Sequence, residues 1–182
     1  MSLKLRNDTY IDWTVYSVTK IKGKYGFRIK LDYKDETIIQ QKSGFSTKKV
    51  AEERRNITIA ELTSHTYVVY PNIKVSEFYD YWLNEVMKSK IEYNSYMSYR
   101  NAVCNYIIKE YGTLKMTTLN QAHIQKLYNH VTKEHISVAK IVKTVMNNSL
   151  DYAKTMNIVS ANVATDIDLP KTVKKKEYRT LN

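Results

Sequence analysis

The sequence predicts an α+β fold, in which a small three-stranded antiparallel sheet packed on one helix is followed by an all-α region of four helices. Apolar and basic residues alternate with period two over residues 27–31, which is typical of a half-buried strand. From residue 75 onward apolar residues instead recur with helical spacing. Between these regions, residues 68–73 contain Pro71 and indicate an extended linker.

Three segments carry the strand pattern. Residues 14–22 are rich in β-branched and aromatic side chains, residues 27–31 alternate, and residues 37–42 form a third candidate strand. Glycines separate the first two segments, and a short charged loop precedes the third.

The alternation in the second strand divides its side chains between two faces. Phe27, Ile29 and Leu31 share one face, and Arg28 and Lys30 share the other. One helix can cover the apolar face, so the basic face stays open to solvent or to a partner. Some of the following residues are expected on that open face: Lys20, Lys22, Gln40, Gln41 and Lys42.

The covering helix is expected to follow Gly44, which breaks the sheet pattern. Ser46 or Thr47 can cap its start, and helical spacing continues to about Ser64. The apolar positions that define it are Val50, Ala51, Ile57, Ala60 and Leu62.

Four amphipathic helices are expected in the second region, where they form a small bundle. Thr118 with Gln121 three residues later predicts a capping box at the start of the third helix. Ser137 is the expected cap of the fourth.

Charge is the strongest compositional signal. The 182 residues contain 29 Lys and Arg against 18 Asp and Glu, a net charge of +11, which favours a polyanionic partner. A basic face that is merely solvated is the alternative. No apolar run is long enough for a membrane helix, so we expect a soluble protein of the cytoplasm that binds no membrane. The single cysteine, Cys104, is expected to be a buried core residue.

Patterns for catalysis, cofactors and metals are missing. The four glycines match no phosphate-binding loop, so no nucleotide cofactor is expected. His130 and His135 are five residues apart and diverge on a helix, so no metal site is expected either. We predict no catalytic residues in this chain.

Two sets of motifs resemble one family. Gly44-Phe45-Ser46-Thr47-Lys48-Lys49-Val50-Ala51 resembles the "GF-x-TK-x-x-A" signature of the arm-binding domain in tyrosine recombinases of phages and conjugative transposons. Trp82-Leu83 and Ser95-Tyr96-Met97-Ser98-Tyr99 resemble the first two helices of that family's SAM-like core-binding domain. Further matching positions are Val103, Ile107, Gly112, Ser137, Ala153, Asn162 and Leu169-Pro170. The sequence departs from the family pattern at Tyr106, Lys109 and Val163.

The resemblance implies a domain organisation. Residues 1–66 would be the arm-binding domain, 67–74 a linker, 75–170 the helical core-binding domain, and 171–182 a basic linker towards a catalytic domain that this chain lacks. We therefore expect the chain to be the DNA-binding portion of an integrase that positions attachment-site DNA for integration and excision of a phage or mobile element. It would cleave no strand by itself, whereas its full-length parent would be a site-specific tyrosine recombinase of a bacterial or phage-infected bacterial cell.

The partner implied is double-stranded DNA at arm and core attachment sites, with a monomeric fragment and a tetrameric parent. Arginine and glutamine can read base edges, and hydroxyls, amides and cations can hold phosphates. The candidate DNA-binding residues of the sheet domain are Lys20, Lys22, Lys24, Arg28, Lys30, Gln40, Gln41 and Lys42. Those of the helical domain and its basic linker are Asn94, Ser95, Ser98, Tyr99, Arg100, Ser137, Lys140, Lys143, Asn147, Lys174 and Lys175. Core packing is the alternative role for Tyr99, and helix capping for Ser95 and Ser137.

Two other functions stay open at this point. A small basic and aromatic sheet can also stack single-stranded bases, as in an RNA-binding accessory protein. The chain could equally be an adaptor that binds a recombination protein, with incidental basic charge.

Overall fold

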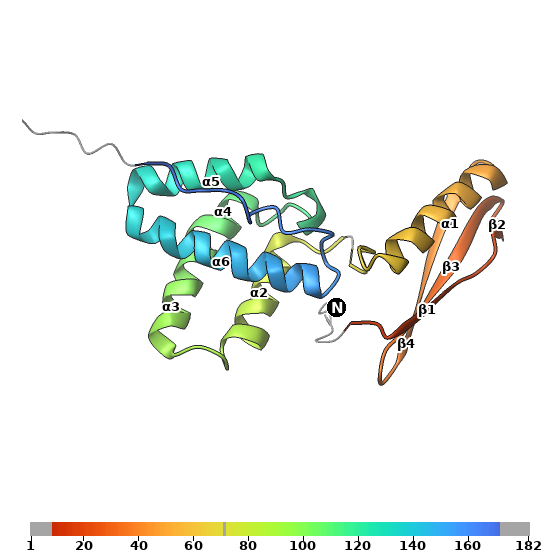
Figure 1. Ribbon diagram of the computed structural model, residues 1–182, viewed down its shortest axis with the longest axis horizontal. Coiled ribbons are helices and arrows are strands. Elements are labelled where there is room, and N and C mark those ends of the chain that lie inside the picture. Colours follow the sequence, from red (N-terminus) through yellow and green to blue (C-terminus); the bar gives the residue numbers. More distant parts are fainter. Residues whose placement is uncertain (1–8, 71, 172–182) are drawn as a thin grey trace, which may run out of the picture. The chain divides into compact units, whose positions relative to one another are not determined.

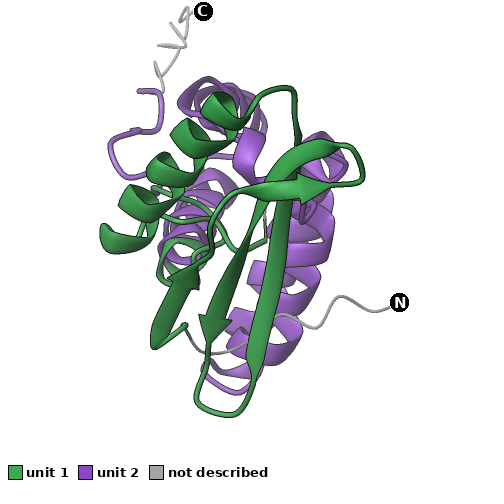
Figure 2. Ribbon diagram, turned by 90° about the vertical axis from the view of Figure 1, so that its right-hand side faces the viewer, with its two compact units in different colours: residues 1–71, 152–161 green, residues 72–151, 162–182 purple. Residues whose placement is uncertain are grey.

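The computed structural model of the chain describes residues 9–70 and 72–171, which form two compact units. Unit 1 comprises Met1–Pro71 with Tyr152–Ala161, and unit 2 comprises Asn72–Asp151 with Asn162–Asn182 (Figure 2). Unit 1 holds an antiparallel sheet packed on one helix and unit 2 is helical, which confirms the predicted α+β fold class. None of the described helices is long and apolar enough to span a membrane.

The sheet of unit 1 has four strands, where the sequence predicted three. They are β1 (Asp12–Val15), β2 (Thr19–Ile21), β3 (Lys24–Asp32) and β4 (Thr37–Phe45), and β3 pairs antiparallel with each of the others (Figure 1). The segment expected as one strand over 14–22 is thus two strands. Its interruption has a visible cause: Arg55 of the helix α1 (Lys48–Thr63) donates hydrogen bonds to the carbonyl oxygens of Val15 (3.0 Å) and Tyr16 (2.9 Å), where β1 ends.

Strand β4 continues through Gly44, where the sequence indicated the end of the sheet. Tyr25 pairs with Phe45 whereas Gly26 pairs with Ser43, so Gly44 is an extra residue in a β-bulge. Its φ of 101° lies in the region that glycine adopts without strain. The bulge keeps Phe45 in the sheet, with its ring stacked on that of Phe27.

The core of unit 1 lies between the sheet and α1. Phe27, Ile29 and Leu31 of β3 are completely buried, together with Leu62 of α1. Each such side chain contributes about 1.5–3 kcal/mol by leaving water. Thr47, one of the two predicted caps, accepts a hydrogen bond from the Val50 amide at the start of α1.

A distant segment of the chain also belongs to unit 1. The Nδ2 of Asn157 donates to the carbonyl oxygen of His65 (2.9 Å), and the amide of Val69 donates to the carbonyl oxygen of Asn157 (2.8 Å). These bonds fix the backbone that follows α1, a long-range pairing that local sequence patterns do not reveal.

Unit 2 contains the four predicted helical rods. The first is α2 (Val75–Tyr81) continued by the π-helix η1 (Trp82–Met87), the second is α3 (Tyr93–Ala102) continued by the π-helix η2 (Val103–Ile108) and α4 (Lys109–Tyr111), and the others are α5 (Gln121–Glu134) and α6 (Ile136–Thr155). A short 3-10 helix, η3 (Met116–Thr118), precedes α5. Cys104 of η2 is exposed, so its predicted burial is wrong; its neighbour Val103 takes the core position.

Two predicted helix caps are wrong. Asn120 caps α5, because its Oδ1 accepts a hydrogen bond from the His123 amide at 3.0 Å. Thr118 instead closes η3, where its hydroxyl donates to the carbonyl oxygen of Lys115. Helix α6 begins at Ile136, so Ser137 lies inside its first turn and is not its cap.

Tyr79 is a central contact of the unit 2 core. It is completely buried, its hydroxyl lies 2.8 Å from the Oγ of Ser149, and its ring meets the edge of Trp82. Burial raises the pKa of Tyr79, so the hydroxyl stays protonated and available as a hydrogen-bond donor.

Gly26 of β3 lies close against the backbone of β4. A Cβ at Gly26 would lie 2.6 Å from the carbonyl oxygen of Lys42 and 2.8 Å from the Cα of Ser43, which are backbone atoms that cannot turn away. We expect Gly26→Ala to lower the free energy of unfolding by about 1–3 kcal/mol, measured by denaturant unfolding. Ser43→Ala, on the opposing strand, is the control and should change it by about 0.5 kcal/mol or less. Equal stability of the two variants would contradict the close approach.

Candidate nucleic-acid interface

The face of the sheet opposite α1 presents cationic and amide side chains. Residues paired across antiparallel strands share a face, and Arg28 is paired with Gln41; both are exposed. In the next row, Lys30 has Thr14 of β1 as one partner and Ile39 of β4 as the other. We call the whole face of the sheet on which these five residues lie the open face. Its donors, acceptors and apolar groups are of the kinds that read base edges.

Sequence reasoning missed part of this surface. Ile39 is 64% exposed and Tyr16 is 46% exposed, which is unusual for large apolar side chains. The amide of Tyr16 donates to the carbonyl oxygen of Arg28 at 3.0 Å, which places it beside that residue. The alternation along 37–42 could have identified Ile39, because it lies two residues from Gln41. No sequence pattern indicated that β1 ends at Val15, and so none indicated that Tyr16 is exposed on this face.

One end of the open face is acidic. The Nζ of Lys30 donates to Asp32 at 2.8 Å, and the hydroxyl of Thr37 donates to the other oxygen of Asp32 at 2.6 Å. These two hydrogen bonds hold the pKa of Asp32 below its usual range, and the same contact raises the pKa of Lys30. Asp12 is the strand partner of Asp32. The exposed positive charge of the face is therefore concentrated toward Arg28.

Gln40 and Lys42 lie on the other side of β4. They are paired with Ile29 and Phe27, which point into the core, so these two of the five candidates for the open face do not lie on it. Gln40 accepts a hydrogen bond from the hydroxyl of Tyr67 at 2.6 Å, and the ammonium of Lys42 lies 4.7 Å from the centre of the Tyr67 ring.

The three remaining lysines of the sheet surround the turn between β2 and β3. Lys22 lies in the turn with a φ of 49°, and Lys24 begins β3. Lys20 is paired with Tyr25, and its ammonium lies 5.8 Å from the centre of that ring. All three lysines are exposed, but Lys20 shares the face of Tyr25 and so is not on the open face.

In unit 2, the start of α3 brings several predicted residues together. Asn94, Ser95 and Ser98 are exposed within the first two turns, and the hydroxyl of Ser98 donates to the carbonyl oxygen of Asn94. Tyr99 is half-buried, and its ring is stacked on Trp82 at 6.2 Å. Arg100 is exposed near the end of the helix. Tyr99 therefore has a packing role, whatever else it contacts.

On α6 the predicted residues differ in their availability. Ser137 and Lys140 are exposed. The Nζ of Lys143 donates to Asp168 at 2.6 Å, which neutralises its charge and lowers the pKa of Asp168. Asn147 is half-buried. The predicted residues Lys174 and Lys175 lie outside the described residues.

Part of the helical region is similar to a known domain family. Residues 74–131 match the family described as "Phage integrase, N-terminal SAM-like domain", a segment that runs from the start of α2 through most of α5. The match implies DNA binding as part of a tyrosine recombinase, and no catalytic domain is detected in the 182 residues. No curated protein and no solved structure is significantly similar to the chain. Within residues 9–70 and 72–171, no three His, Cys, Asp or Glu side chains gather as they would around a metal ion.

The ion pair on the open face gives a prediction for titration. We expect the carboxyl group of Asp32 to titrate below the ordinary aspartate pKa of about 3.9. Because its pKa is lower in the folded than in the unfolded chain, the contact stabilises the fold above the ordinary pKa. That stabilisation is lost as the pH falls through the lowered value.

Carbon-detected NMR titration measures this pKa directly. In Lys30→Met the pKa of Asp32 should rise, because its main hydrogen-bond donor is gone, whereas Lys34→Met, in the exposed loop after β3, should leave it unchanged. An Asp32 pKa that is the same in all three proteins would contradict the described contact.

Proposed function

We propose that this chain is the DNA-binding portion of a tyrosine-recombinase integrase, and that its two units hold different segments of attachment-site DNA. The observation that carries the proposal is the match of residues 74–131 to the integrase SAM-like domain. The basic open face of unit 1 and the net charge of +11 support it.

Unit 1 is proposed to read sequence through its open face. The major groove admits a two-stranded β-ribbon, and Arg28 and Gln41 lie side by side across β3 and β4. Arginine suits the O6 and N7 of guanine, glutamine suits the N6 and N7 of adenine, and the exposed Ile39 can contact a thymine methyl group. The acidic end at Asp12 and Asp32 would be repelled by phosphates and so would orient the face.

Unit 2 is proposed to hold the DNA backbone. Hydroxyl and amide groups at the start of α3 and the exposed Lys140 of α6 are groups that contact phosphates irrespective of sequence. Lys143 contributes less, because its charge is already paired with Asp168.

Two linked units bind one DNA more tightly than either alone. Once the first has bound, the second is held near the DNA at a high effective concentration. In the proposed role the chain selects and positions attachment sites, and no strand-cleavage step is placed on its residues.

Two substitutions separate the proposed roles. We expect Arg28→Ala to cost about 1–3 kcal/mol on the preferred duplex and much less on a scrambled one, because a base contact is lost. We expect Lys140→Ala to weaken both duplexes alike and to reduce the salt slope by about 1, because a phosphate contact is lost. Fluorescence anisotropy with both duplexes across a salt series measures these effects.

The control for charge alone is Lys34→Ala, in the loop after β3, which should change binding of either duplex little. If Arg28→Ala and Lys140→Ala had the same effect on both duplexes, the division between base reading and backbone holding would be wrong.

A further inference from the structure

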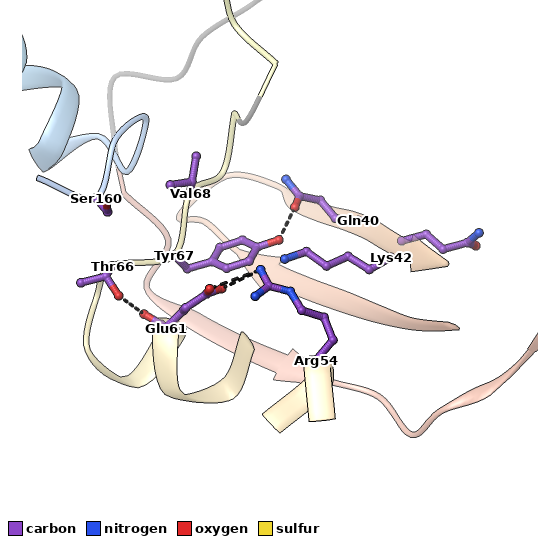
Figure 3. Close-up of a pocket in the computed structure, with 9 residues that line it drawn as sticks. Gln40, Lys42, Arg54, Glu61, Thr66, Tyr67, Val68 and Ser160 are labelled. Carbon is purple, nitrogen blue, oxygen red and sulfur yellow. Dashed lines mark hydrogen bonds and ion pairs between the residues drawn. The ribbon is translucent and has the colours of Figure 1, made fainter. Parts of the chain in front are cut away.

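Unit 1 contains a pocket that shares one lining residue, Gln41, with the open face. It lies between α1, β4 and the backbone after α1, and has a volume of about 610 Å³ (Figure 3). Lys42 and Gln40 of β4, Arg54 and Glu61 of α1, and Tyr67 contribute to its walls. Because side chains alternate along β4, these two strand residues point away from the face that carries Ile39 and Gln41.

The pocket holds more positive than negative charge. Arg54 is paired with Glu61, with 3.2 Å between guanidinium nitrogen and carboxylate oxygen. Among the described residues, no carboxylate lies within ion-pair distance of Lys42. Figure 3 shows the Lys42 ammonium and the Arg54 guanidinium directed toward the same point beside Tyr67. The pocket therefore brings together two cationic side chains, Lys42 and Arg54, and one carboxylate, Glu61.

This excess charge is partly removed from water. Lys42 is half-buried, with its ammonium over the Tyr67 ring. Burial, and then the nearby charge of Arg54, lower the pKa of Lys42, while the charge of Glu61 opposes them. Like charges that converge in a half-buried place destabilise each other, and an anion bound between them relieves that repulsion.

The neutral wall of the pocket is held in place by hydrogen bonds. The hydroxyl of Tyr67 donates to the Oε1 of Gln40, and the Nε2 of Gln40 donates to the carbonyl oxygen of Val69 at 2.9 Å. Burial raises the pKa of Tyr67, so its hydroxyl stays neutral and cannot supply the missing negative charge. Among these wall residues Glu61 is thus the one negatively charged group.

We propose that this pocket is a phosphate-binding site, in which Lys42 and Arg54 hold the oxygens of a phosphate group. Guanidinium presents a planar set of donors that fits oxyanions, and an ammonium adds a compact charge. The volume is large enough for a tetrahedral oxyanion with its attached group. All residues that line the site belong to unit 1. The proposal does not depend on whether the open face reads DNA. The phosphate group belongs either to the backbone of bound DNA or to a free phosphate compound.

Calorimetric titration of the full chain with inorganic phosphate and with pyrophosphate, at constant ionic strength in chloride, tests the site. We expect saturable binding of at least one of the two, weakened about tenfold or more in Lys42→Gln, since a charge-assisted hydrogen bond is lost. Glu61→Gln should tighten binding severalfold, because it removes the competing carboxylate from Arg54. A gain in affinity cannot come from misfolding. Lys49→Gln, an exposed lysine of α1, is the control and should leave the Kd unchanged.

The same variants distinguish the two sources of the phosphate group. If the site holds the DNA backbone, pyrophosphate competes with duplex DNA, and Lys42→Gln weakens preferred and scrambled duplexes equally. If it holds a free phosphate compound, Lys42→Gln binds duplex DNA as the parent chain does while losing pyrophosphate. No saturable binding of either anion, or equal anion affinity in the Lys42→Gln and Glu61→Gln variants and the parent chain, would overturn the proposal.

Discussion

The side-chain alternation of β3 is the constraint on which unit 1 depends. Its odd-numbered residues Phe27, Ile29 and Leu31 are completely buried against α1, so Arg28 and Lys30 must face away. A shift of one residue would expose the core and bury two cations, at a cost of many kcal/mol. Strand β3 pairs with β1, β2 and β4. Its register therefore determines which side chains of these three strands face α1 and which face away. Burial of the apolar side chains of β3 thus determines that Arg28 and Lys30 lie on the open face.

Strand β4 shows how far the constraint reaches. Paired with β3, it places Ile39 on the open face and directs Gln40 and Lys42 toward the pocket beside α1, while Gln41 lies on the open face and also lines the pocket. One short polar segment thereby supplies two surfaces with different chemistry, one suited to base edges and one to an anion. The bulge at Gly44 shifts the register by one residue beyond this segment, so that Phe45 pairs with Tyr25.

Local patterns predicted the fold class, the capping residue Thr47 and the four helical rods, because each depends on neighbours in sequence. They failed where a distant group decides the outcome. Arg55 of α1 donates hydrogen bonds to the carbonyl groups at the end of β1, a long-range contact that splits the segment expected as one strand. The family resemblance was confirmed over 74–131.

On the candidate interface, Arg28 and Lys30 were placed correctly by their own alternation. The sequence left open which of Gln40, Gln41 and Lys42 share that face, because the register of their strand was ambiguous; the pairing with β3 places Gln41 there.

In the proposed function, this chain reads double-stranded DNA. The most direct measurement is selection of bound sequences from a random duplex library with the full chain, followed by affinity measurements across a salt series on the selected duplex, a scrambled duplex and single-stranded RNA. We expect enrichment of a shared sequence, preference for that duplex over both competitors, and a steep salt dependence. No enrichment, or tighter binding of single-stranded RNA, would contradict it.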